Sequence, residues 1–249
     1  MKKILFLFLT IALGFHVAQA AEQDNAFQFL TGSCLQIDDY SFKLLTGQEI
    51  QEIIPFMVQQ RMAVFGEYPY FYAGTIQEDL AQVQWSAGLL DAAVAVAYYK
   101  REPIGFVSGA NFVEYAAIFE NSCALFEKHG YNPNDFYYVP EAIVVAEHRG
   151  KWLFRDLHWI INMHAQMLGY KAMCLIAGSH EHYSRKPVDY RGPEGAFMKA
   201  GYYKTQMTSV WTWATIQGDG SVIKQEHSLD YWIKLLWNYC DEPMTYGFF

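Results

Sequence analysis

The fold of this chain is decided by residues 137–169, which read YYVPEAIVVAEHRGKWLFRDLHWIINMHAQMLG. An extended and mostly apolar segment, Tyr137 to Ala146, is followed by a basic turn at residues 147–151. The second half has apolar residues on one side at helical spacing and polar residues on the other, which predicts an amphipathic helix. The apolar set is Leu153, Leu157, Ile160, Ile161 and Leu168, and the polar set is Arg155, His158, Asn162 and Gln166.

A strand, a basic turn and a helix in this order predict an anion site. The first backbone N–H groups of a helix have no internal partner and the helix dipole is positive there, so a phosphate can dock without a dedicated side chain. The cluster His148, Arg149, Lys151 and Arg155 adds positive charge at the same place.

The composition favours one folded domain behind an export signal. The chain has 249 residues, of which 52% are hydrophobic and 18% charged, enough for a sizeable core. Residues 1–20 combine Lys2 and Lys3, a short apolar run and small residues before Ala20, which predicts a cleaved signal peptide and a periplasmic or secreted protein. The run is shorter than the roughly 20 residues of a bilayer span, so no permanent membrane span is expected. Residues 21–249 are predicted to form a single domain.

The net charge and the cysteine content limit the binding partners and the disulfide pairings that are possible. Without residues 1–20, 16 basic residues face 26 acidic ones, a net charge of −10, which argues against nucleic acid as a partner. In an oxidising compartment Cys34, Cys123, Cys174 and Cys240 allow three full pairings, and the sequence does not choose among them. Cys174 lies in an apolar run and is expected to be a small buried residue.

The remaining elements are predicted from periodicity and turn residues. A first helix over residues 46–66 is expected to break or bend at Pro55, and a second helix spans residues 77–86. The apolar runs 92–99 and 104–109 predict an antiparallel hairpin. A helix over 115–129 precedes the central strand, and strands follow over 171–177, 209–216 and 221–225. The whole reads as a mixed α/β domain in which a hairpin precedes a strand–helix–strand unit.

This order resembles the GNAT acyltransferase superfamily over about residues 61–237. The most specific pieces are residues 147–151, Arg155, the strand ending at Ala177, and residues 195–203. A bacterial subgroup also has an aromatic passage like Glu67 to Tyr70, a glutamate like Glu141 and a pair like Trp211 and Trp213. The resemblance implies a GNAT-like fold with a mixed central sheet flanked by helices, and acetyl-CoA as acyl donor.

The resemblance also implies the cofactor-binding residues, which are Val144, Val145, Arg149, Gly150, Lys151, Trp152, Leu153, Phe154 and Arg155. The superfamily's loop has glycine at the place of Trp152 and glycine or alanine at the place of Phe154. Glycine lets the backbone come close to a pyrophosphate. The two aromatic side chains therefore either obstruct that approach or move the loop to another path.

Resemblance and position indicate Glu141 as the base that takes the proton of an acceptor amine, because a carboxylate in an apolar strand should have a raised pKa. A glutamate in a structural ion pair is the alternative. The superfamily often uses a tyrosine as proton donor, and Phe197 stands at the matching place. Tyr190 is the predicted substitute, with Tyr202 and Tyr203 as alternatives.

Three other interpretations stay open. His180 and His182 suggest a metal, but their spacing matches no zinc signature, so no metal is predicted. Trp152, Trp159 and Met163 form a second apolar line on the central helix, to be covered by the N-terminal segment or the tail Tyr246 to Phe249, or by a partner in a homodimer.

The favoured function is an N-acetyltransferase acting on a small-molecule or peptide amine. The alternative is a catalytically silent exported binding protein with a degenerate CoA loop.

Overall fold

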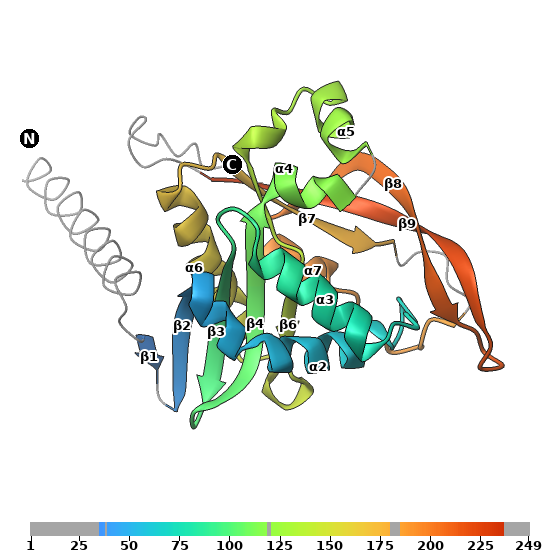
Figure 1. Cartoon of the computed structure of the whole chain (residues 1–249), viewed down its shortest axis with the longest axis horizontal. Coiled ribbons are helices and arrows are strands. Elements are labelled where there is room, and N and C mark those ends of the chain that lie inside the picture. Colours follow the sequence, from blue (N-terminus) through green and yellow to red (C-terminus); the bar gives the residue numbers. More distant parts are fainter. Residues whose placement is uncertain (1–34, 38, 119–120, 180–184, 237–249) are drawn as a thin grey trace, which may run out of the picture.

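The computed structural model describes residues 35–37, 39–118, 121–179 and 185–236 (Figure 1). The predicted signal segment 1–20, the histidines His180 and His182, the tail from Tyr246, Cys34 and Cys240 all lie outside these residues.

Within the described residues, nine strands form one sheet in the order β1-β2-β3-β4-β5-β7-β9-β8, with β6 paired to β4 beside this path. The strands are β1 Leu35–Ile37, β2 Tyr40–Thr46, β3 Ala93–Tyr99, β4 Glu102–Asn111, β5 Phe136–Tyr138, β6 Ala142–Val144, β7 Ala172–Gly178, β8 Tyr203–Ile216 and β9 Val222–Leu235. The β5–β7 pair is parallel and the other pairs are antiparallel. The sheet is therefore mixed, as the sequence predicts.

The helices cover this sheet on both faces. The α-helices are α2 Ile54–Phe65, α3 Ile76–Ala87, α4 Phe112–Tyr115, α5 Ser122–Lys128, α6 Leu153–Met167 and α7 Glu194–Lys199. Short 3₁₀ turns are η1 Gly47–Glu52, η2 Ala116–Ile118, η3 Pro133–Asp135 and η4 Ala146–His148.

The two faces of β3 show how the core is divided. Ala93, Ala95 and Ala97 join the cluster of buried residues around α6, whereas Val94 and Val96 join the cluster under α2 and α3. Because successive side chains of a strand point to opposite faces, α6 and the α2–α3 pair lie on opposite faces of the sheet. Small alanines on the α6 side let that helix pack closely against β3.

The central unit confirms the predicted strand–helix–strand arrangement, with one correction. The strand expected over Tyr137 to Ala146 is broken into β5 and β6 around Pro140, which has no N–H to donate to a ladder. The N–H of Val139 still donates to the carbonyl of Cys174 at 2.8 Å, but β6 pairs with β4 and not with β7. The central strand and β7 therefore separate after Val139, and Glu141 lies between two strands and not inside one.

Several helix predictions are corrected in detail. The helix over 46–66 is divided into η1 and α2, and Pro55 stands in the first turn of α2, which confirms the predicted break. The helix over 115–129 is interrupted, because Asn121 adopts a left-handed backbone with φ 65° before α5. The helix over 77–86 and the 92–109 hairpin are confirmed as α3 and β3–β4.

The ends of the described chain contain strands that the sequence analysis missed. β2 pairs with β3 along all seven of its residues. β8 and β9 each have 14 residues, so the last hairpin is far longer than the predicted runs 209–216 and 221–225. Figure 1 shows this hairpin extending past the rest of the sheet. Polar and apolar residues are mixed along it, which hides the strand period.

Two residues of α6 are not where the helical pattern puts them. His158, predicted on the polar side, is only 2% exposed, and Leu168, predicted on the apolar side, is 44% exposed and caps the end of the helix. α6 is covered on more of its circumference than the pattern indicates, because Phe154 and Tyr202 pack against His158.

Candidate functional site: the turn before α6 and the buried carboxylate

The turn between β6 and α6 keeps a compact path. Its first turn, η4, is followed by Arg149, whose Nε donates to the carbonyl of Val144 at 2.9 Å and ties the turn to the end of β6. Gly150 has φ 76° and Trp152 has φ 65°, both in the left-handed region. Two left-handed residues this close together turn the chain sharply into the first turn of α6.

This geometry leaves backbone donors free. Within the described chain, the N–H groups of residues 150–155 donate to no backbone or side-chain acceptor, and the first bond of the helix is from Asp156 N–H to the carbonyl of Trp152 at 3.1 Å. α6 has 15 residues, so its N-terminal turn carries a full helix dipole. Free amides at the start of a helix form an arrangement that can accept an anion.

Trp152 occupies the position where a glycine is expected, and it adopts the backbone conformation that glycine favours. Its side chain is 63% exposed and lies under the guanidinium of Arg155, 5.1 Å from the ring centre. The indole therefore lies on the surface and points away from the core.

Phe154 lies differently, in the first turn of α6. Its half-buried ring has its centre 4.3 Å from that of His158 and 6.4 Å from that of Phe197 on α7. Leu153, on the same turn, is 3% exposed and belongs to the core. The rings of Phe154 and Phe197 thus lie near each other between α6 and α7, in the core cluster around α6.

The basic cluster is partly neutralised. Arg155 pairs with Asp156 at 2.8 Å, and the Nζ of Lys151 donates to the hydroxyl of Tyr40 at 3.2 Å. His148 also lies 3.3 Å from that hydroxyl, and its ring packs against Tyr99. Lys151 and Arg149 remain exposed beside the free amides, so the turn stays positive. Val145 is partly buried at the end of β6.

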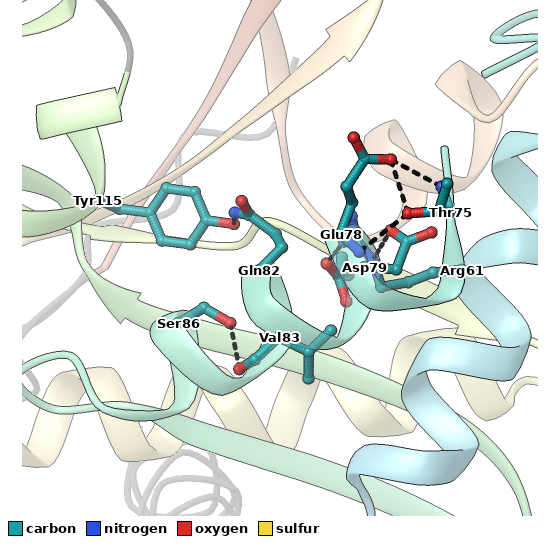
Figure 2. A network of polar contacts seen from close by, with 9 residues as sticks. Arg61, Thr75, Glu78, Asp79, Gln82, Val83, Ser86 and Tyr115 are labelled. Atoms are coloured by element: carbon teal, nitrogen blue, oxygen red, sulfur yellow. Dashed lines mark hydrogen bonds and ion pairs between the residues drawn. The ribbon is translucent and has the colours of Figure 1, made fainter. Parts of the chain in front are cut away.

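Glu141 is buried on the face of the sheet that α2 and α3 cover, and it pairs with an arginine that it shares with a second carboxylate. Its side chain is 4% exposed, and one carboxylate oxygen contacts the guanidinium of Arg61 from α2. The Nε of Arg61 also binds Asp79 of α3 at 2.9 Å. Figure 2 shows Arg61 reaching Asp79 beside the contact between Thr75 and Glu78 that caps α3. The other oxygens of Glu141 and Asp79 are buried without a hydrogen-bond partner.

The sequence analysis missed Arg61 and Asp79. Each belongs to a separate helix, and no local motif connects them to Glu141. A weak signal exists in the pattern, because Asp79 directly follows the Thr75–Glu78 capping box and therefore lies in the first turn of α3, where its side chain is buried.

Tyr190 lies among the aromatic residues that follow α2. Its ring centre is 4.5 Å from that of Tyr68, and burial, with a smaller contribution from Tyr70, raises the pKa of Tyr190 to about 12. Tyr70 packs edge-on against Phe65 at 5.0 Å, and the guanidinium of Arg61 lies 5.1 Å from the centre of the Phe65 ring. Tyr70, which influences the pKa of Tyr190, thus also packs on the residue that lies beside Arg61, the partner of Glu141.

The alternative tyrosines have other environments. Tyr202 is 3% exposed in the α6 core, and its hydroxyl is near the sulfur of Met173 at 4.0 Å. Tyr203 is 43% exposed and lies 3.5 Å from the hydroxyl of Tyr131. Phe197 is 8% exposed and packs on Trp232.

Three features of the described part of the chain concern metal ions, membranes and thiols. Its residues contain no group of three or more histidine, cysteine or acidic side chains arranged to hold a metal ion. Among the helices described, none is both long and apolar enough to cross a membrane. Cys123 and Cys174 are free thiols, and the full burial of Cys174 confirms its prediction as a core residue.

These observations define the class of fold. The chain is a mixed α/β protein with a multi-stranded sheet flanked by helices, in which a tight turn with free backbone amides joins β6 to α6. No protein-family model and no curated protein matches the chain.

Solved structures with a similar fold are GNAT-family acetyltransferases and related acetyltransferases. The GNAT-family acetyltransferase of Streptococcus pneumoniae is 11% identical with a TM-score of 0.45, and the match covers 79% of this chain and 99% of that one. The ribosomal-protein-alanine N-acetyltransferase of Brucella melitensis is 13% identical with a TM-score of 0.48, covering 78% and 99%. A Bacillus anthracis protein assigned as a streptothricin acetyltransferase, in complex with acetyl coenzyme A, is 12% identical with a TM-score of 0.39, covering 61% of this chain and 66% of that one. At such identities the likeness concerns the fold and says nothing of the substrate.

Proposed function

We propose that this protein is an acyl-CoA-dependent N-acetyltransferase. The observation that carries the proposal is the row of free amides at residues 150–155, at the start of a 15-residue helix and beside exposed Arg149 and Lys151. Such a site suits a pyrophosphate, which binds to backbone N–H groups and a helix dipole. The residues of the turn therefore fit the diphosphate part of acetyl-CoA.

In this proposal different parts of the chain bind different parts of acetyl-CoA. The backbone of residues 150–155 holds the diphosphate, and the end of β6 at Val144, with Val145 directly after it, supports the acyl arm. When bound, acetyl-CoA supplies the acetyl group as a reactive thioester. Placement of the two reactants is the main contribution of the protein to such a transfer.

Glu141 is the proposed base. Its Arg61-bound oxygen keeps the carboxylate in place, and its second oxygen is buried with no partner and so has a free lone pair for a proton. Tyr190 is the proposed proton donor, because a pKa of about 12 keeps a proton on its phenol oxygen at neutral pH. The aromatic residues between Phe65 and Tyr72 form the wall of the proposed acceptor site, and the acceptor is a small-molecule or peptide amine.

A second function is favoured by Phe154. Its ring meets Phe197 in the space between α6 and α7, where the family pattern has a glycine or alanine, and a side chain there narrows the path of an acyl arm. The protein would then bind an anion or a small molecule at the same turn without catalysing a transfer. In this version the Glu141–Arg61 pair is a structural ion pair.

Titration calorimetry with acetyl-CoA on the purified protein separates these functions. The enzyme hypothesis expects saturable binding that is lost when Arg149 and Lys151 are both changed to Ala. It also expects Phe154→Ala to tighten binding of acetyl-CoA and to leave binding of ADP, which has a diphosphate but no acyl arm, unchanged. The absence of binding at millimolar acetyl-CoA removes the enzyme hypothesis. Binding without transfer to any primary amine in a mixed amine panel supports the silent binding protein.

Export by residues 1–20 belongs to the same proposal as a separate claim. Intact-mass measurement of the protein recovered from the periplasm or the medium of an expressing bacterium tests it, and a mass that begins at Ala21 is the expected result.

A further inference from the structure

The outer edge of the sheet is formed by β8, the last strand in the order of the sheet. From Thr205 to Gln217 this strand has neither a charged residue nor a proline, and it is rich in threonine and tryptophan. Natural proteins normally protect a long edge strand with charges, prolines, bulges or a covering element, because its unpaired backbone groups accept a further strand. The register of β8 and β9 shifts between Lys204 and Thr208, which interrupts the start of the edge, so the surface for strand pairing is the part of β8 from Thr208 onward.

Part of this edge is already covered. The N–H of Ala73 donates to the carbonyl of Ala214 at 2.9 Å, and the N–H of Ile216 donates to the carbonyl of Phe71 at 2.8 Å. The segment 71–73 thus pairs with the last residues of β8. The even-numbered residues Ala214 and Ile216 direct their backbone groups outward to make these bonds.

The same direction holds for the preceding residues. β8 and β9 keep one register from Thr208↔Asp230 to Ile216↔Val222, so the alternation of backbone directions is unbroken. Gln217, an odd-numbered residue, donates inward to the carbonyl of Ser221 at 2.8 Å, which agrees with this alternation. The N–H and C=O groups of Thr208, Val210 and Thr212 therefore point away from β9.

These three residues are exposed and without a hydrogen-bond partner in the described part of the chain. The side chain of Val210 is 61% exposed. Only the even-numbered residues of β8 direct their backbone N–H and C=O groups away from β9. The residues whose outward groups are unpaired, Thr208, Val210 and Thr212, are placed symmetrically about Val210. A second copy of the same strand, antiparallel about a two-fold axis at Val210, matches each donor with an acceptor.

We propose that the protein forms a homodimer in which β8 pairs with β8 of a second copy. Val210 lies opposite Val210 of the other copy, and Thr208 lies opposite Thr212. About six main-chain hydrogen bonds join the copies, since each N–H and C=O of the three residues meets its counterpart. Threonine pairs and a valine pair across the axis are favourable cross-strand neighbours. The register also places an uncharged segment on an uncharged segment.

This pairing makes one continuous sheet through two copies and uses a surface separate from α6 and from the turn at residues 147–155. It does not depend on the proposed acetyl transfer. A short pairing of this size is a weak interface, so association should depend on protein concentration in the micromolar range.

Sedimentation velocity over a concentration series tests the proposal on the full protein and on two variants. The wild type is expected to move from monomer to dimer as its concentration rises. Val210→Lys places two like charges directly opposite each other and should weaken association at least about tenfold. Val222→Lys is the matched control, because Val222 is 56% exposed on the neighbouring strand of the same hairpin and should associate like the wild type.

A monomer at all concentrations, or a dimer that Val210→Lys leaves unchanged, overturns the proposal. Hydrogen exchange of the wild type gives a measurement that needs no variant. Exchange of the Val210 amide should slow as concentration rises, whereas that of Trp211, which faces β9, should not change. Equal behaviour of the two amides also overturns the proposal.

Discussion

Arg61 and Glu141 form a buried ion pair, and the same guanidinium also holds Asp79, so one cation is shared by two buried carboxylates. Arg61 is 12% exposed and the two carboxylates are less exposed still. Two carboxylates around one arginine leave an excess negative charge in the interior. Removal of the arginine should therefore destabilise the fold more than removal of either carboxylate.

We expect Arg61→Met to lower the free energy of unfolding by about 3–5 kcal/mol, because it leaves two buried carboxylates without a counter-charge. Glu141→Gln should cost less, since Arg61 keeps Asp79 as a partner. Urea denaturation measures both. Lys171→Met is the control, because the Lys171–Asp135 pair has a lysine that is 67% exposed and should contribute no more than about 1 kcal/mol. Equal losses for Arg61→Met and Lys171→Met would contradict the buried network.

We expect Glu141→Gln to lower the turnover of acetyl transfer by about 10²–10⁴-fold, the usual contribution of a general base, while the dissociation constant for acetyl-CoA stays the same. Steady-state kinetics and calorimetry on one preparation separate the two effects. Glu127→Gln, at an exposed position on α5, is the control and should leave turnover unchanged. Unchanged turnover in Glu141→Gln would assign Glu141 a structural role only.

Trp152 stores backbone strain, since a non-glycine residue with φ 65° is in the left-handed region. We expect Trp152→Gly to be more stable than Trp152→Ala by about 1 kcal/mol, because alanine keeps the strain and glycine removes it. Both variants lose the indole and its contact with Arg155, so their difference isolates the backbone. Urea denaturation midpoints with equal slopes provide the comparison, and an alanine variant as stable as the glycine variant would show an unstrained turn.

His158 should make the fold sensitive to acid. Its burial, with nearby Lys234, lowers its pKa to about 3, and neither ring nitrogen has a hydrogen-bond partner. Above about pH 6.5 the imidazole is neutral in the folded and unfolded chain, and no effect arises. As pH falls from about 6.5 toward 3, only the unfolded chain takes up the proton, so stability decreases.

We therefore expect His158→Leu to flatten the loss of stability between pH 6.5 and pH 4. The free energy of unfolding of the variant minus that of the wild type should be about 2 kcal/mol higher at pH 5 than at pH 8. Urea denaturation at the two pH values measures this change. Parallel losses in the variant and the wild type would show that His158 can be protonated inside the fold.

Much of the fold follows from local patterns. The helix α6, the hairpin β3–β4 and the parallel pair around α6 are predicted because their apolar periods are strong and their turns carry marked residues. The break at Pro140 and the long β8–β9 hairpin are missed, since one residue that cannot donate and a strand with mixed polarity leave weak periodic signals.

The sequence likewise predicts some parts of the candidate site and not others. The free amides before α6 are predictable, because every helix begins with N–H groups that have no partner. The outward position of Trp152 and the burial of His158 are not predictable, since both depend on what packs beside α6. The partners of Glu141 are also invisible in the sequence, because Arg61 and Asp79 lie on two helices far from it along the chain.

The sequence by itself therefore determined the strand–turn–helix unit and its positive turn, because hydrogen bonding within a helix and the period of side chains are local properties of a chain. Only the tertiary structure decided which charge Glu141 faces, which side of the turn Trp152 occupies and which edge of the sheet stays open. Those depend on the order of the strands, which brings together residues that no local pattern connects.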